Sequence, residues 1–360
     1  MTPFSTNPDS TADIVWSDPA RAALFAQWLS ATSAACQLAP ATLRLASADA
    51  SFRRYFRVDR VDQSMGSCII MDAPPLKEDC RPFVKVAQLM QQAGLLAPDV
   101  LAWDEPNGFM LLSDLGTQTM MQAIDPAQPE ANLGLYLHAV DALVTWQTAS
   151  KPDVLPPYDQ ALLQRELGLF PEWYLGRHRG LTLDGAQQST LDAAFATIMA
   201  QNLAWPRVYV HRDFMPRNLM VAGDRLGVLD FQDAVYGPIT YDVASLMRDA
   251  FLSWDEDFCL DVTVRYWERA RRAGLPVGDD FGEFYRGVEW MGLQRHLKVA
   301  GIFARLTLRD GKPQYLADTP RFIGYIRATC GRYRELKPLL RLVDQIEGVT
   351  AVNGYAFGQV

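Results

Sequence analysis

The sequence predicts an α+β protein with two unequal lobes, a small β-rich N-terminal lobe and a larger, mainly helical C-terminal lobe. Short runs of alternating apolar residues lie between residues 41 and 113, as expected for strands. From residue 114 onward the apolar residues recur mainly with the period of a helix. The chain has 360 residues, and at roughly 150 residues per domain this length favours two domains. We therefore place the lobes at residues 1–113 and 114–360.

Charge and composition argue against several classes of protein. The chain carries 34 Lys+Arg and 42 Asp+Glu, a net charge of −8, whereas general nucleic-acid binders usually have an excess of basic residues. The N-terminus lacks the layout of a signal peptide, and no uncharged apolar run approaches the roughly 18 residues of a membrane span. Five scattered cysteines without a Cys-x-x-Cys pair favour reduced thiols. We expect a cytoplasmic protein with no nucleic-acid or membrane partner, and its oligomeric state stays open.

In the N-terminal lobe, a helix is expected first. Asp18-Pro19 predicts its start, and the apolar pattern carries it over residues 20–29. A second helix is expected over residues 79–93, ending before Gly94. Alternating runs then predict strands at residues 42–46, 54–58, 68–71, 99–103 and 108–112.

The C-terminal lobe combines helices with a short β segment. A strand at residues 208–210 is expected, followed by a hairpin of residues 219–221 and 226–229 around Gly223-Asp224. Helices are predicted near residues 131–148, 160–175, 186–203, 242–273, 282–308 and 319–345.

The most specific stretch of the sequence surrounds this hairpin. His211, Asp213 and Asn218 have the spacing His-x-Asp-x-x-x-x-Asn, and the hairpin ends at Leu229-Asp230-Phe231. We expect the hairpin to bring Asn218 close to Asp230, with Asp213 facing them. Phosphoryl transfer from ATP uses one carboxylate to accept the proton of the attacking hydroxyl, and an amide oxygen and a second carboxylate to hold Mg²⁺. The alternative is that these are ordinary turn and cap residues.

With the stretches at 110–116 and 237–244, these residues resemble the aminoglycoside phosphotransferase/choline kinase family, which shares the protein-kinase-like fold. More narrowly, the chain resembles the bacterial anomeric kinases of N-acetylmuramate and N-acetylglucosamine that act in peptidoglycan recycling. Five stretches carry this narrower resemblance, at residues 50–58, 71–75, 211–220, 229–242 and 293–306. The resemblance implies an ATP- and Mg²⁺-dependent sugar kinase, a phosphotransferase whose acceptor is an alcohol group.

The resemblance also implies roles for individual residues. Asp213 is expected to be the catalytic base, with His211 bracing its loop and Asp242 supporting that loop from behind. Asn218 and Asp230 are expected to bind the metal. Nucleotide contacts are expected from two segments. A loop that covers the phosphates would contribute Ser51, Phe52, Arg53 and Arg54, and a hinge segment near adenine would contribute Leu112, Ser113, Asp114 and Leu115.

The chain departs from the kinase pattern at two places. Kinases usually place a phosphate-binding lysine on the third strand, but residues 69–72 contain none, and the loop at 47–52 contains no glycine. Our hypothesis is that Arg53 or Arg54 replaces the lysine, and Lys77 or Lys85 could also reach the phosphates. The alternative for the two arginines is an ordinary role as solvated charges on a strand edge.

Substrate contacts are expected from two regions. Arg295 and His296 lie beside the apolar stripe of the helix predicted at 282–308, and in the resembled family such helices supply sugar-binding residues. An arginine there could pair with the lactyl carboxylate of N-acetylmuramate, but both residues could equally lie at the surface. Arg217 and Asp233 flank the expected metal site, where each could bind substrate or phosphate, or form a structural ion pair.

Three other functions stay open. A kinase of the same fold could act on an aminoglycoside or another small alcohol. The missing lysine would suit a non-catalytic, nucleotide-binding pseudokinase. Asp213 and Asp230 could also form a hydrolase pair, although no Ser/His/Asp order or set of metal-binding histidines supports it.

Overall fold

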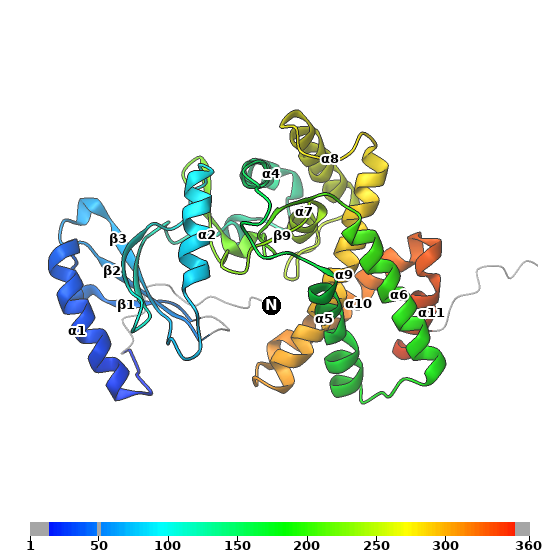
Figure 1. Cartoon of the computed structure of the whole chain (residues 1–360), viewed down its shortest axis with the longest axis horizontal. Coiled ribbons are helices and arrows are strands. Elements are labelled where there is room, and N and C mark those ends of the chain that lie inside the picture. Colours follow the sequence, from blue (N-terminus) through cyan, green and yellow to red (C-terminus); the bar gives the residue numbers. More distant parts are fainter. Residues whose placement is uncertain (1–13, 49–51, 350–360) are drawn as a thin grey trace, which may run out of the picture. The chain divides into compact units, whose positions relative to one another are not determined.

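The computed structural model describes residues 14–48 and 52–349, and the chain divides into two compact units (Figure 1). The first unit comprises residues 1–126 together with 216–234, and the second comprises 127–215 together with 235–360. The first contains a five-stranded sheet, whereas the second is mainly helical. The predicted α+β class is therefore confirmed, while the lobe boundary at residue 113 stays a prediction.

The first unit is built on an antiparallel sheet with the strand order β1-β2-β3-β5-β4. The predicted strands are all present, with ends that differ by one or two residues. The elements of this unit are α1 (Pro19–Cys36), β1 (Arg44–Ala48), β2 (Arg54–Asp59), β3 (Ser67–Asp72), α2 (Arg81–Gln92), β4 (Val100–Asp104), β5 (Phe109–Ser113), α3 (Met120–Ala123), β7 (Leu219–Ala222) and β8 (Arg225–Val228).

Helices α1 and α2 lie on opposite sides of this sheet (Figure 1). The Asp18 carboxylate caps α1 by accepting a hydrogen bond from the Ala20 amide at 2.9 Å. Because successive side chains of a strand point to opposite faces, alternate residues of β2, β3 and β5 meet α1. The resulting core contains Phe25, Leu29, Leu38, Phe56, Val58, Cys68, Ile70, Phe109 and Leu111.

One carboxylate on the α1 face binds two arginines. Asp72 has only 1% of its side chain exposed and is the cross-strand partner of Arg54. Its Oδ2 accepts from Arg54 Nε at 3.0 Å, and its Oδ1 accepts from Arg21 Nε at 2.7 Å. The Arg54 guanidinium also lies 3.8 Å from the centroid of the Trp16 ring. Asp72 therefore links α1 to β2 and β3.

The second unit is organised around α9, the longest helix, which contacts α5, α6, α7, α8 and α10 (Figure 1). Its elements are α4 (Leu133–Thr148), α5 (Gln160–Leu169), α6 (Gly185–Leu203), β6 (Arg207–Val210), β9 (Val235–Pro238), α7 (Thr240–Met247), α8 (Glu256–Arg272), α9 (Phe281–Leu308), α10 (Thr319–Arg332) and α11 (Lys337–Glu347). In the described part of the chain, none of the helices is long and apolar enough to cross a membrane.

The predicted helices of this unit are interrupted at three places. The helix predicted over 242–273 ends at Met247 and resumes after Asp255, whose carboxylate caps α8 by accepting from the Phe258 amide at 2.9 Å. The helix predicted over 319–345 breaks at Tyr333, which has an extended backbone. The helix predicted over 160–175 ends at Leu169 and continues as a π-helix to residue 178.

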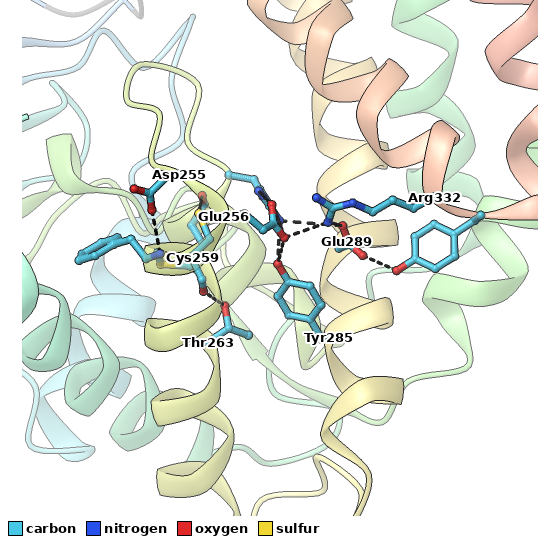
Figure 2. Close-up of polar contacts among 11 residues, drawn as sticks. Asp255, Glu256, Cys259, Thr263, Tyr285, Glu289 and Arg332 are labelled. Carbon is cyan, nitrogen blue, oxygen red and sulfur yellow. Dashed lines mark hydrogen bonds and ion pairs between the residues drawn. The ribbon is translucent and has the colours of Figure 1, made fainter. Parts of the chain in front are cut away.

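A charge network around the buried Glu289 ties α8, α9 and α10 together (Figure 2). Glu289 of α9 is 5% exposed and accepts hydrogen bonds from Arg332 and Tyr333. Arg332 also donates to Glu256 Oε1 at 2.8 Å, and Glu256 accepts from Tyr285. A buried carboxylate is stable only where donors replace its lost water, so this network fixes the positions of the three helices.

The Asp72 contact yields a prediction about stability. Asp72→Ala leaves two arginine side chains without their shared buried partner, so we expect the free energy of unfolding to fall by about 3–5 kcal/mol. The control is Asp79→Ala, which removes a pair with Arg81 whose side chains are 51% and 71% exposed. For this exposed pair we expect a loss of under about 1 kcal/mol. Urea unfolding measures both, and equal losses would contradict the assignment of Asp72 as the anchor of α1.

Candidate active site

In the second unit, the loop that follows β6 is held by its backbone amides. The Asp242 carboxylate of α7 accepts hydrogen bonds from the amide of His211 at 2.6 Å and from that of Arg212 at 3.0 Å. Asp242 and His211 are both buried. Burial raises the pKa of Asp242 to about 6, although the two amides and His211 act in the opposite direction. Asp242 and His211 are thus brought together.

Asp213 is only partly buried at the end of this loop. Its amide donates to His211 Nδ1 at 3.3 Å. Burial alone would raise the pKa of the Asp213 carboxyl, but the positive charges of Lys298, Arg295 and Arg212 lower it below its usual range. Asp213 is therefore a carboxylate near neutral pH, and it can orient a hydroxyl group.

Two residues of the motif adopt a left-handed backbone, with φ of 77° at Arg212 and 61° at Asp230. Such values are uncommon for residues other than glycine, and they cost free energy that the surrounding contacts must offset. Strained backbone of this kind occurs often at functional sites, where it fixes the direction of a side chain.

In the first unit, the hairpin closes as predicted. The amide of Leu229 donates to the carbonyl oxygen of Asn218 at 2.9 Å, and Asn218 Nδ2 lies 3.4 Å from Asp230 Oδ2. Asp230 Oδ1 also accepts from Gln232 Nε2 at 2.8 Å. The amide oxygen of Asn218 and the carboxylate of Asp230 are hard ligands, of the kind that Mg²⁺ prefers, so this pair fits the metal that the sequence implies.

The same hairpin is anchored to the N-terminal part of the first unit. The amide of Val228 donates to the carbonyl of Leu96 at 2.8 Å. The rings of Phe231 and Phe83 of α2 are 4.8 Å apart. Asp230, which precedes Phe231, is consequently fixed relative to α2 and the sheet.

The two candidate phosphate-binding arginines have different carboxylate partners. Arg53 Nη2 lies 3.0 Å from Glu78 Oε2, and its side chain is 10% exposed. Burial lowers the pKa of Arg53, but Tyr55, Glu78 and Asp230 raise it above its usual value, so the charge of Asp230 acts on this guanidinium. Arg54 instead points to the α1 face, where it binds Asp72.

The other expected nucleotide contacts are in the first unit. Ser51 lies outside the described residues. Phe52 is 60% exposed, and its amide lies 3.3 Å from Glu78 Oε1. Leu112 is buried on β5, and the hydroxyl of the next residue, Ser113, accepts from the amide of Asp99 at 2.8 Å.

Asp114 and Leu115 follow β5 and are held by neighbouring strands. The Asp114 carboxylate accepts from Arg57 Nε and from the Ser67 hydroxyl, both at 2.6 Å. These contacts overcome burial and lower the pKa of Asp114. A side chain at Gly227 of β8 would place its Cβ 2.7 Å from Leu115 Cδ1, so glycine permits β8 to pack closely against this segment.

The four candidate substrate residues occupy different surroundings. Arg217 and Asp233 are exposed in the first unit. Arg295 and His296 are buried on α9 in the second unit. The His296 ring stacks on Tyr325 with 4.7 Å between centroids, and burial lowers its pKa to about 3, so the imidazole is neutral. Their substrate roles stay predictions.

Three polar residues next to the loop in the second unit, Glu166, Arg212 and Lys298, were not predicted from the sequence, although their neighbour Arg295 was. Arg295 Nη1 donates to the carbonyl of Arg212 at 2.6 Å, and Arg212 Nη2 lies 2.5 Å from Glu166 Oε1. Lys298 lies 3.0 Å from the same oxygen. A signal was present, since Arg295 and Lys298 are three positions apart on a helix with a buried apolar stripe, and charges at such positions need a buried partner.

Comparison with known proteins gives a consistent set of relatives. The model of the phosphotransferase enzyme family matches residues 42–277. An N-acetylmuramate/N-acetylglucosamine kinase of Neisseria meningitidis serogroup B is 50% identical over 85% of this chain and 91% of its own length. A protein of the same name from Pseudomonas aeruginosa is 49% identical over 86% of this chain and 90% of its own length.

A solved structure with this fold is an amicoumacin kinase in complex with AMP-PNP, Ca²⁺ and amicoumacin. The two chains share 14% identity and a TM-score of 0.57, over 85% of this chain and 94% of that one. At this identity the likeness concerns the fold alone, and it confirms the predicted kinase-like fold.

Burial of Asp242 predicts pH-dependent stability. The pKa of Asp242 is about 6 in the folded chain and 3.8 ordinarily, so the folded state holds this proton more tightly than the unfolded state. The resulting contribution to the free energy of unfolding is fully present below pH 3.8 and is lost as the pH rises through about 6. The loss is on the order of 3 kcal/mol, since one pKa unit corresponds to about 1.4 kcal/mol. Asp242→Asn cannot ionise. We therefore expect the urea midpoint of Asp242→Asn, relative to that of the wild type, to increase as the pH is raised from about 4.5 to about 7.5. A constant difference over this range would contradict the raised pKa.

Proposed function

This chain belongs to the phosphotransferase enzyme family, and on that premise we propose that it transfers the terminal phosphoryl group of ATP to the anomeric hydroxyl of N-acetylmuramate and N-acetylglucosamine. The observation that carries the proposal is the 50% identity with a kinase of these two sugars over 91% of that enzyme. The motif from His211 to Asp230 supplies the chemical groups that such a transfer needs.

In this proposal Asp213 is the residue that meets the sugar. Its carboxylate accepts the proton of the anomeric hydroxyl while the oxygen attacks the terminal phosphorus and the bond to the leaving ADP breaks. The lowered pKa of Asp213 keeps it ionised, which favours orienting the hydroxyl over strong proton abstraction. Positioning of the hydroxyl then supplies much of the acceleration.

Asn218 and Asp230 are the residues proposed to hold Mg²⁺, which neutralises charge on the phosphates when it is bound. The hairpin supports this role because it places the two side chains next to each other, with Asn218 Nδ2 3.4 Å from Asp230 Oδ2. The fold-related amicoumacin kinase, solved with AMP-PNP and Ca²⁺, also favours a nucleotide with a divalent cation.

Arg53 is the residue that we propose to contact the phosphates in place of the missing lysine. Its guanidinium forms an ion pair with Glu78, and the negative charge of Asp230 helps to raise the pKa of Arg53. These interactions support a cation near the proposed metal ligands. An arginine offers several donors in a fixed plane and is suited to binding phosphate oxygens.

We propose a cytoplasmic location and a small-molecule substrate. All five cysteines are free, and Cys68, Cys80, Cys259 and Cys330 are buried, which favours a reducing compartment. N-acetylmuramate and N-acetylglucosamine are small amino sugars, and the named relatives act on them.

The sugar proposal is tested by measuring ATP consumption with N-acetylmuramate, N-acetylglucosamine, choline and aminoglycosides. We expect turnover of the two amino sugars alone, with ³¹P NMR locating the phosphate on the anomeric oxygen. Asp213→Asn retains the shape of the side chain but removes the proton acceptor, so kcat is expected to fall by at least about 100-fold. Turnover of an aminoglycoside or choline alone would overturn the substrate assignment, and ATP binding without any turnover would favour a nucleotide sensor.

The arginine proposal is tested by ATP affinity. Arg53→Ala is expected to raise the Kd for MgATP by about tenfold or more, because it removes a charge-assisted contact worth on the order of 1.5–3 kcal/mol. Arg54→Ala is the matched control, since it removes the neighbouring arginine from the other face of the sheet. We expect its Kd to stay within about twofold of the wild type, while its thermal stability falls with the loss of the Asp72 contact. Equal affinities for both variants would refute the assignment of Arg53.

A further inference from the structure

One buried carboxylate in the second unit receives four hydrogen-bond donors. Glu166 of α5 is 4% exposed. Its Oε1 lies 2.5 Å from Arg212 Nη2 and 3.0 Å from Lys298 Nζ. Its Oε2 accepts from the Tyr158 hydroxyl at 2.6 Å and from Gln294 Nε2 at 2.9 Å. The carboxylate is thereby fixed from several directions.

The electrostatics agree with this geometry. Burial raises the pKa of Glu166, but the charges of Lys298 and Arg212 and the hydrogen bond from Tyr158 lower it to about 2. Glu166 is thus an anion at every working pH, balanced by cations that come from the loop and from α9.

The position of Tyr158 depends on a glycine in β9. A Cβ at Gly237 would lie 2.6 Å from the Tyr158 Cβ, closer than two such atoms can approach. The Tyr158 ring also meets Tyr241 edge-on, with 5.2 Å between centroids. Tyr241 in turn accepts from Lys298 Nζ at 3.2 Å, so the donors of Glu166 are themselves held by packing.

Arg212 connects this cluster to the loop. Its backbone is left-handed, with φ of 77°, and the next residue is Asp213. All three of its polar parts are held: the amide by Asp242, the carbonyl by Arg295 and Ser245, and the guanidinium by Glu166. An unfavourable backbone conformation persists only when the surroundings determine it in this way.

We propose that Glu166 is a positioning residue for the phosphoryl transfer, because its hold on the Arg212 guanidinium fixes the backbone that aims the Asp213 carboxylate. Asp242 binds the amides of His211 and Arg212, whereas Glu166 binds the Arg212 guanidinium, so the two carboxylates hold different parts of the loop. This inference rests on the proposed function, in which Asp213 orients the attacking hydroxyl. Displacement of the Asp213 carboxylate by about 1 Å would slow such a reaction about 100-fold.

The test compares two buried carboxylates of the same unit. Glu166→Gln keeps the shape of the side chain but removes the charge that binds Arg212 and Lys298. Glu289→Gln is the control, since Glu289 is similarly buried and binds Arg332 and Tyr333 in the network that ties α8, α9 and α10 together (Figure 2). Both variants should lose thermal stability, so a difference between them reports the position of the loop and not stability in general.

We expect Glu166→Gln to lower kcat by about 10- to 100-fold while the KM values for ATP and sugar stay within about twofold, because the loss falls on orientation in the transition state. Glu289→Gln should keep kcat within about twofold of the wild type. Hydrogen exchange of a peptide that covers residues 211–214 should accelerate in Glu166→Gln and not in Glu289→Gln. Equal kcat and equal exchange in the two variants would reduce Glu166 to a structural role.

Two further measurements cover the cases in which the variant does not fold or the wild type has no sugar kinase activity. If Glu166→Gln does not fold, Arg212→Met removes the other end of the contact from a side chain that is 19% exposed, and it should show the same loss of kcat and the same faster exchange. If the wild type phosphorylates neither amino sugar, the proposed function fails. The exchange experiment needs no substrate and still decides whether Glu166 orders the loop.

Discussion

The buried carboxylate of Asp242, with two backbone amides directed at it, is the contact on which the loop of the second unit depends. A loop between strands has no ladder partner for its amides, and buried amides without acceptors are costly. Asp242 meets this need from α7, which contacts α9, and α9 in turn supplies Arg295 and Lys298. The buried negative charges of the loop region are therefore matched by cations whose positions follow from helix packing.

Pairing of arginines with carboxylates also organises the sheet of the first unit. Strand β2 carries arginines at positions 54 and 57, and strand alternation sends them to opposite faces. Arg54 binds Asp72 under α1, whereas Arg57 binds Asp114 at the end of β5. Each face thus has its own carboxylate, and the segment after β5 is fixed by a pair that is separate from the one that anchors α1.

Local patterns in the sequence predict much of this molecule. Alternation gives the strands, and the spacing from Asn218 to Asp230 across a two-residue turn gives the pair that the hairpin brings together. The separation of Arg54 from Arg53 was also predictable, because Phe56 and Val58 mark the core face that Arg54 shares. The contacts of Glu166 were not, since Gln294 follows it by 128 positions and no local period reports such a pairing. Strand β9 was missed because Gly237 and Pro238 hide its strand character.

Asp72 stands at the end of the strand where kinases of this fold commonly carry a lysine, and here it holds a helix instead. The sheet therefore relies on residues that precede it in the chain to cover its apolar face. A shortened protein that starts after Cys36 would leave Phe56, Ile70 and their neighbours in contact with water, beside an aspartate that has lost Arg21. Exposed apolar sheet surfaces of this kind favour self-association. By covering this face, α1 prevents such association in addition to contributing to the core.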